Sequence, residues 1–138
     1  DIEKRELRPE EIFNTQKTVF QHFSNGGRVI EAMRRLRDSP EAAEEFPPLR
    51  VAWSEKDRRW YSADNRRLFM LKVTEIAHTT VRVINWTPEF DQKLRQHPQG
   101  GLVWFTTPDS IEKVRAMVDS SDLDRDTWLQ SDEDAPAS

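Results

Sequence analysis

The chain has 138 residues, no cysteine, 36 % hydrophobic and 33 % charged residues, and a formal net charge of −4 at pH 7. This length is typical of one domain, and the absence of cysteine excludes disulfides, thiolate metal sites and a thiol nucleophile. No apolar run approaches the roughly 18 residues of a membrane span, and no signal peptide opens the chain. The sequence therefore predicts no membrane segment and an intracellular location, cytoplasmic or nuclear.

The negative charge is concentrated at the C-terminal end. Residues 119–138 carry seven acids and one base, a net charge of −6, whereas the rest of the chain carries +2. We therefore expect a single α+β domain over residues 5–118. Residues 119–138 form an acidic tail with a composition typical of disordered segments. Leu123 and Trp128 within it suggest either a solvating linker or a segment that binds a protein partner.

The first thirty residues predict a strand and a helix. Residues 7–12 favour a short strand that is interrupted at Arg8-Pro9. A helix is expected next, because Asn14 or Thr15 can cap it and three apolar residues follow at helical spacing: Val19, Phe20 and Phe23. Gly26-Gly27 would end this helix, since glycine tolerates the left-handed cap conformation.

The middle of the chain predicts a helix followed by a hairpin. The second helix begins near Val29 and has an apolar stripe formed by Val29, Ile30, Met33 and Leu36. Residues 38–48 contain three prolines and predict a loop. Residues 49–53 alternate as a strand does, residues 55–58 form a polar turn, and residues 59–61 are expected to return as the second strand.

The second half predicts three helices and two strands. Asp64 is expected to cap a helix that runs to Lys72, and residues 81–86 alternate as a strand. Threonine followed by proline begins two more helices, at Thr87-Pro88 and Thr107-Pro108. Residues 102–105 between them predict an edge strand. The last helix is amphipathic through Ile111, Val114, Met117 and Val118.

The most informative motif is Asp64-Asn65-Arg66-Arg67, which stands between a strand and a helix. A helix N-terminus presents unpaired N–H groups and a partial positive charge. Two arginines at such an end predict a phosphate site, because a guanidinium can hold two phosphate oxygens at once. The alternative interpretation is that Asp64 only caps the helix and that both arginines are solvated.

The order of elements and this motif resemble the ParB/sulfiredoxin fold family over about residues 5–86. Residues 64–67 correspond to Gly-Glu-Arg-Arg or Gly-His-Arg-Arg in ParB-like proteins and to Gly-Cys-His-Arg in sulfiredoxins. Pro48-Leu49-Arg50-Val51 is similar to the family's Pro-Ile-x-Val strand, and residues 7–12 and 81–84 to the strands that precede and follow the motif. The resemblance implies a small mixed sheet with flanking helices, and a loop at residues 64–67 that binds nucleotide phosphates.

The motif also departs from the family. Asp64 stands where the family has glycine, and Asn65 stands where sulfiredoxins have their catalytic cysteine, so sulfinic-acid repair is excluded. Asn65 also replaces the acidic or histidine residue of ParB-like proteins. The resemblance thus implies a nucleotide- or phosphate-binding module with weak or no catalysis, with Mg²⁺ accompanying the nucleotide as a candidate cofactor. The expected site is lined by Thr15, Tyr61, Ser62, Asn65, Arg66 and Arg67.

Two alternatives remain open at this point. The aromatic residues and the acidic tail suit a non-enzymatic module that binds a protein partner, in which Arg66 and Arg67 would be tied up in ion pairs with nearby acids. A nucleic-acid-binding or nuclease domain is not favoured, because the charge of +2 outside the tail is low for such proteins. The three histidines have no ligand spacing, so no metal site is predicted.

Overall fold

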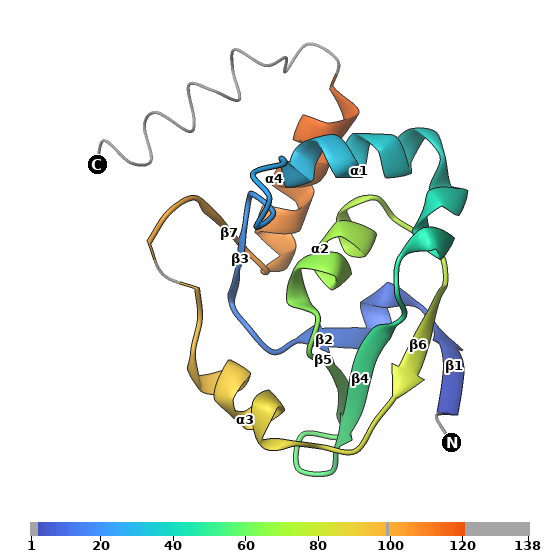
Figure 1. Cartoon of the computed structure of the whole chain (residues 1–138), viewed down its shortest axis with the longest axis vertical. Coiled ribbons are helices and arrows are strands. Elements are labelled where there is room, and N and C mark those ends of the chain that lie inside the picture. The colour runs from blue at the N-terminus through green and yellow to red at the C-terminus, as the bar shows by residue number, and fades with distance from the viewer. Residues whose placement is uncertain (1–2, 99, 121–138) are drawn as a thin grey trace.

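The computed structural model describes residues 3–98 and 100–120, which form a five-stranded mixed sheet, a separate two-stranded sheet and flanking helices (Figure 1). The predicted α+β class is therefore confirmed. The strands are β1 (Glu3–Leu7), β2 (Ile12–Asn14), β3 (Thr18–Phe20), β4 (Leu49–Ser54), β5 (Arg59–Ser62), β6 (Thr79–Val83) and β7 (Val103–Phe105). The helices are α1 (Val29–Asp38), α2 (Asn65–Val73), α3 (Pro88–Arg95) and α4 (Pro108–Asp119), with short 3₁₀ turns η1 (Pro9–Glu11) and η2 (Pro40–Glu45).

The large sheet has the strand order β1-β6-β4-β5-β2. The β4–β5 hairpin at its centre is antiparallel, as predicted, and its polar turn ends at Arg58, whose φ is +59°. The β4–β6 and β2–β5 pairs are parallel, and β1 closes one edge antiparallel to β6. This arrangement places the end of β5, and therefore the start of α2, beside the end of β2.

Two predictions for the N-terminal region are wrong. Residues 7–12 do not form one strand: Leu7 ends β1, Ile12 begins β2, and η1 lies between them, because Pro9 cannot donate to a strand ladder. The predicted helix after Thr15 is absent. Residues 18–20 instead form β3, which pairs antiparallel with β7, so a strand distant in the sequence supplies the hydrogen bonds that a helix would have made internally.

The other elements largely follow the predictions. The helices expected at Val29, Asp64, Thr87 and Thr107 are all present. The strand predicted at 81–86 runs instead from Thr79 to Val83, and the loop predicted at 38–48 contains η2. Gly26 has a φ of +91° in a turn that brings His22 beside Arg28, where a helix end had been expected.

The predicted tail begins inside α4. Asp119 is the last residue of that helix, and its carboxylate lies 2.6 Å from the Arg37 guanidinium on α1. Residues 121–138 lie outside the described residues. Within the described part, no helix is long and apolar enough to cross a membrane.

The core is organised around α2, which is buried on two sides (Figure 1). Phe69, Met70 and Val73 pack with α1, α4 and the two-stranded sheet. Leu68 and Leu71 pack on the large sheet. The opposite face of that sheet carries a smaller cluster that Phe90 of α3 completes, together with Ala52, Tyr61 and Ala63. The start of α2 is thus held by both the sheet and the helical layer.

Lys72 is a charged residue of α2 whose side chain is partly buried. Lys72 faces β2, and its Nζ atom lies 3.5 Å from Oδ1 of Asn14. Burial lowers the pKa of Lys72 from 10.5 to about 8, and the charge of Glu10 opposes this shift only in part. A lysine whose pKa is lower in the folded state destabilises the protein while it is protonated.

We expect Lys72→Met to raise the free energy of unfolding at pH 7 by up to about 3 kcal/mol, the equivalent of the pKa difference. The gain shrinks as the pH rises from about 8 to 10.5, because the folded lysine is then already deprotonated and removing the proton that the unfolded state still holds costs less as the pH rises. Urea denaturation at pH 7 and pH 10 measures it, with Lys113→Met on the exposed face of α4 as the control. If Lys72→Met raised the free energy of unfolding equally at both pH values, the effect would come from packing and not from the charge.

Candidate functional site

The candidate site is built on the turn between β5 and α2. The chain leaves the sheet at Ser62, whose Oγ atom accepts a hydrogen bond from the Asp64 backbone N–H at 2.9 Å. The Ala63 N–H donates to the Arg50 carbonyl of β4. The Asp64 carbonyl then accepts the first helical bond from Leu68. These three bonds fix the direction in which α2 starts.

Asp64 does not cap the helix with its side chain, contrary to the prediction. Its carboxylate turns to β4, where it accepts from the Arg50 backbone N–H at 2.8 Å and from the Arg50 guanidinium at 2.9 Å. Arg67, one turn into α2, lies 3.0 Å from the same carboxylate. Burial alone would raise the pKa of Asp64, but the hydrogen bonds from Arg50 and the two positive charges hold it below its usual value.

The ion pairs continue from Arg50 to α3. The guanidinium of Arg50 also contacts Glu89 at 3.2 Å, and Glu89 lies 3.1 Å from the Lys93 ammonium. Lys93 in turn donates to the Ala63 carbonyl at 2.6 Å. We call these five residues the Arg50 network: Arg50, Asp64, Arg67, Glu89 and Lys93. The network joins β4, the start of α2 and α3 through side chains that are half-buried or more.

The buried side chain of Asn65 links the start of α2 to the segment that follows β2 through hydrogen bonds. The side chain is 5 % exposed. Its Oδ1 atom accepts from the backbone N–H groups of Thr15 at 2.8 Å and Gln16 at 3.1 Å, and from the Asn14 side chain. Its Nδ2 atom donates to Thr15 Oγ1 at 2.8 Å. Both ends of the amide are therefore engaged within the protein.

The other predicted site residues divide into two groups. Thr15 and Ser62 are buried beneath the start of α2, where the Thr15 hydroxyl donates to the Ser62 carbonyl at 2.9 Å, so they support the turn. Tyr61 does not join them. Its side chain belongs to the cluster on the other face of the sheet, and its hydroxyl donates to Asp57 at 2.8 Å, so the expectation that it lines the same pocket is wrong.

A pocket of about 550 Å³ lies at the start of α2, and we call it the α2 pocket. Its polar wall contains Asn65, Arg66, Arg67, Lys93 and Gln16, with Ala63 and Asp64 at the turn itself. Its apolar wall contains Val19, Phe20, Phe23 and Pro98. The structure thus brings three of the six predicted site residues to one pocket, namely Asn65, Arg66 and Arg67.

Arg66 has an unusual environment in this pocket. It donates to the His22 carbonyl at 2.9 Å, and its guanidinium lies 4.8 Å from the centre of the Phe23 ring. Among residues 3–98 and 100–120, no carboxylate forms an ion pair with it. Burial lowers the pKa of Arg66, which remains charged at neutral pH. The groups described above that contact this positive charge, the His22 carbonyl and the Phe23 ring, are themselves neutral.

Several residues of the α2 pocket were not singled out as site residues from the sequence. Lys93 lies on α3, almost thirty residues after the motif, and Gln16 and Phe20 both lie within the segment that was wrongly predicted to be a helix. The arrangement of β3 beside α2 brings Phe20 and Phe23 to the site, and no local pattern signals that arrangement. The helix start at Thr87-Pro88 indicated that Lys93 lies on a helix, but not that this helix packs beside the motif.

Within the described residues, no group of three or more His, Asp or Glu side chains is arranged to hold a metal ion. The chain matches no protein-family model and no curated protein. The chemistry of the site therefore has to be inferred from its own residues.

We expect Asn65→Ala to lower the free energy of unfolding by about 2–4 kcal/mol, because the buried N–H group of Thr15 and the part-buried N–H group of Gln16 would lose their acceptor. Urea denaturation measures this loss. The matched control is Asn25→Ala, which removes one exposed bond to Gly27. A loss no larger than that of the control would show that the Asn65 hydrogen bonds do not stabilise the fold.

We expect Asp64→Asn to destabilise the protein by about 3 kcal/mol at pH 7, because two arginines would lose their shared carboxylate. The folded-state pKa of Asp64 is lowered, so its contribution is present above the ordinary carboxyl pKa and is lost as the pH falls through the folded value. Denaturation curves of both proteins from pH 7 to pH 2 should converge at the acid end. A constant difference would contradict a role for the charge.

Proposed function

We propose that this chain is a ParB/sulfiredoxin-like module that binds a nucleotide, or a related phosphate-bearing ligand, in the α2 pocket, and that it acts by binding rather than by turnover. The observation that carries the proposal is Arg66, a partly buried guanidinium that lines the pocket and has no carboxylate partner among the described residues. A phosphate group would supply the missing negative charge and accept two of its N–H bonds.

The electrostatics of the surroundings support an anion. Four cations face two carboxylates around the turn, a net charge of +2: Arg50, Arg66, Arg67 and Lys93 against Asp64 and Glu89. The Asp64 carboxylate would repel a phosphate if it were free, but Arg50 and Arg67 both neutralise it. Asp64 stands where the family has glycine, and these two ion pairs reduce the repulsion between its carboxylate and a bound phosphate.

The backbone at the start of α2 adds hydrogen-bond donors. Because the Asp64 side chain turns to Arg50, no side chain caps this helix. The first-turn N–H groups of an α-helix have no partner within the helix, and together with the helix dipole they favour a negatively charged group. The donors and Arg66 belong to the same pocket, so a single phosphate can use both.

The apolar wall favours a nucleotide over a bare phosphate. Phe20 and Phe23 form part of this wall, and the Phe20 side chain is 42 % exposed. Aromatic rings stack on nucleobases with a gain of about 1–3 kcal/mol per base, whatever the base. A volume of about 550 Å³ lies within the usual range for small-molecule sites.

A second candidate function is a protein-binding module on the same scaffold. Phe105 on β7 is 59 % exposed, and Phe20 on the paired strand β3 is exposed as well. In addition, Arg67 is held by Asp64 and by the Pro47 carbonyl, as expected for a structural arginine. These observations favour a partner surface at the two-stranded sheet if no nucleotide binds.

We expect at least one of CTP, ATP, GTP or their diphosphates, with or without Mg²⁺, to raise the thermal unfolding temperature. A ligand at a hundredfold excess over its dissociation constant stabilises the folded state by about 2.7 kcal/mol. Arg66→Gln should weaken this binding at least tenfold in isothermal titration calorimetry, since a charge-assisted hydrogen bond is lost. Arg66 is a sharper probe than Arg67, whose removal would also disturb the Arg50 network.

The control is Arg95→Gln, which removes one exposed positive charge from α3 outside the pocket. It should bind as the wild type does, which separates a local contact from the overall charge. Inorganic phosphate and pyrophosphate serve as further probes of the phosphate contacts alone. A flat response to every nucleotide, or equal affinity in Arg66→Gln, would contradict the proposal and favour the protein-binding function.

A further inference from the structure

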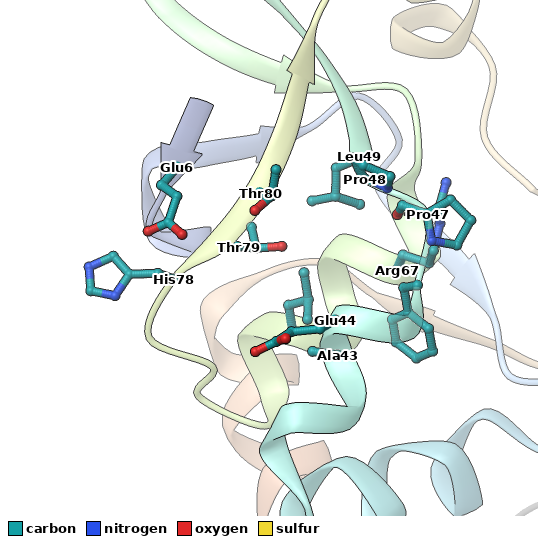
Figure 2. A pocket seen from close by; sticks show the side chains of 12 residues that line it. Glu6, Ala43, Glu44, Pro47, Pro48, Leu49, Arg67, His78, Thr79 and Thr80 are labelled. Carbon is teal, nitrogen blue, oxygen red and sulfur yellow. Dashed lines mark hydrogen bonds between the residues drawn. The ribbon is translucent and has the colours of Figure 1, made fainter. Parts of the chain in front are cut away.

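A second pocket, of about 470 Å³, also has Arg67 in its lining (Figure 2). It is enclosed by η2, the segment before β4, the side of α2 and the first residues of β6. We call it the β6 pocket. Arg67 borders both pockets, and no other residue is common to them.

The floor of the β6 pocket is apolar. Leu49 and Leu71 are almost fully buried at its base, and the remaining apolar residues are Ala43, Phe46, Pro47 and Pro48. An apolar floor of this kind can accept a hydrocarbon chain or an aliphatic side chain. It differs from the α2 pocket, whose apolar wall consists mainly of aromatic rings.

The rim carries unbalanced negative charge. Glu6 comes from β1 and Glu44 from η2, and neither carboxylate makes a hydrogen bond or an ion pair with a described residue. Arg67, which faces the pocket from α2, is already paired with Asp64. Figure 2 shows both glutamates and His78 toward one side of the pocket and Arg67 toward the opposite side.

One edge of β6 is open beside this pocket. Thr79 and Thr80 pair with Leu7 and Glu6 of β1, but the ladder with β4 starts only at Val81 and Leu49. The residues of the neighbouring segment that would continue the ladder are Pro48 and Pro47. Proline has no N–H group and cannot donate to β6. The two prolines therefore end the sheet at this point and leave the first residues of β6 without a β4 partner.

From these features we infer that the β6 pocket is a docking site for an extended basic peptide of a partner protein. A lysine or arginine side chain lays its aliphatic stem on Leu49 and Leu71 and places its charge near Glu6 and Glu44. The peptide backbone adds to the open end of β6 at Thr79 and Thr80. Charge selects the occupant: the rim is negative, so an acidic peptide is repelled.

The test uses the full chain labelled with ¹⁵N and the capped peptide acetyl-Val-Lys-Val-Arg-Val-amide. We expect saturable amide shift changes centred on Leu49, Thr79 and Thr80, with little change at Asn65 and Arg66 in the α2 pocket. Two comparison peptides replace the basic residues with glutamine or with glutamate. The glutamine peptide should bind at least fivefold more weakly, and the glutamate peptide should not bind.

The double variant Glu6→Gln/Glu44→Gln should reduce the affinity for the basic peptide at least fivefold. The matched control is Glu55→Gln/Glu112→Gln, which removes two exposed carboxylates elsewhere and should bind as the wild type does. Equal binding of the basic and glutamine peptides, or no shift changes at millimolar peptide, overturns the inference. Shift changes of the same size with spermidine also overturn it, because a polyamine would then bind through charge alone.

Discussion

The structure depends on the carboxylate of Asp64 being shared between Arg50 and Arg67. This contact turns the Asp64 side chain toward β4, so that it does not cap α2. It leaves the first-turn N–H groups uncapped, and through Arg50 and Glu89 it also holds α3 against the turn. A single carboxylate thereby couples the sheet, the central helix and α3, which packs on the opposite face.

The two pockets differ in the charges that line them. Arg67 shares the Asp64 carboxylate with Arg50, so its charge is partly balanced on both sides. Arg66 therefore dominates the field in the α2 pocket, and Glu6 and Glu44 dominate the field in the β6 pocket. The two cavities, which share Arg67 in their linings, thus carry opposite charge, and each would discriminate against the ligand of the other. A ligand that displaced Arg67 from Asp64 would alter both cavities at once.

The sequence predicted the elements whose signals are local. The proline-initiated helices at Thr87 and Thr107, the β4–β5 hairpin and α2 each have a cap, a turn or an alternation within a few residues. The prediction was wrong at β3, where Val19 and Phe20 match a helical spacing but form a strand that pairs with β7.

Arg66 and Arg67 were identified as site residues from the sequence because they follow a strand–turn–helix motif. Lys93 and Phe20 were not, because only the packing of distant segments brings them to the pocket. Tyr61 was misplaced because a strand residue adjacent to a motif can still face the other side of the sheet.

The pairing of β3 with β7 has a consequence for how the protein is made. Thr18 pairs with Phe105, and Glu3 of the edge strand β1 pairs with Val83, so both strands wait for partners that are synthesised about eighty residues later. Contacts of such large sequence separation slow folding, because the closure of a long loop precedes any gain from the contact. During synthesis the β4–β5 hairpin and α2 can form early, whereas Val19 stays exposed until Trp104 emerges. A nascent chain interrupted before residue 103 would therefore carry an unpaired apolar strand, and this is the stage at which a chaperone would be most needed.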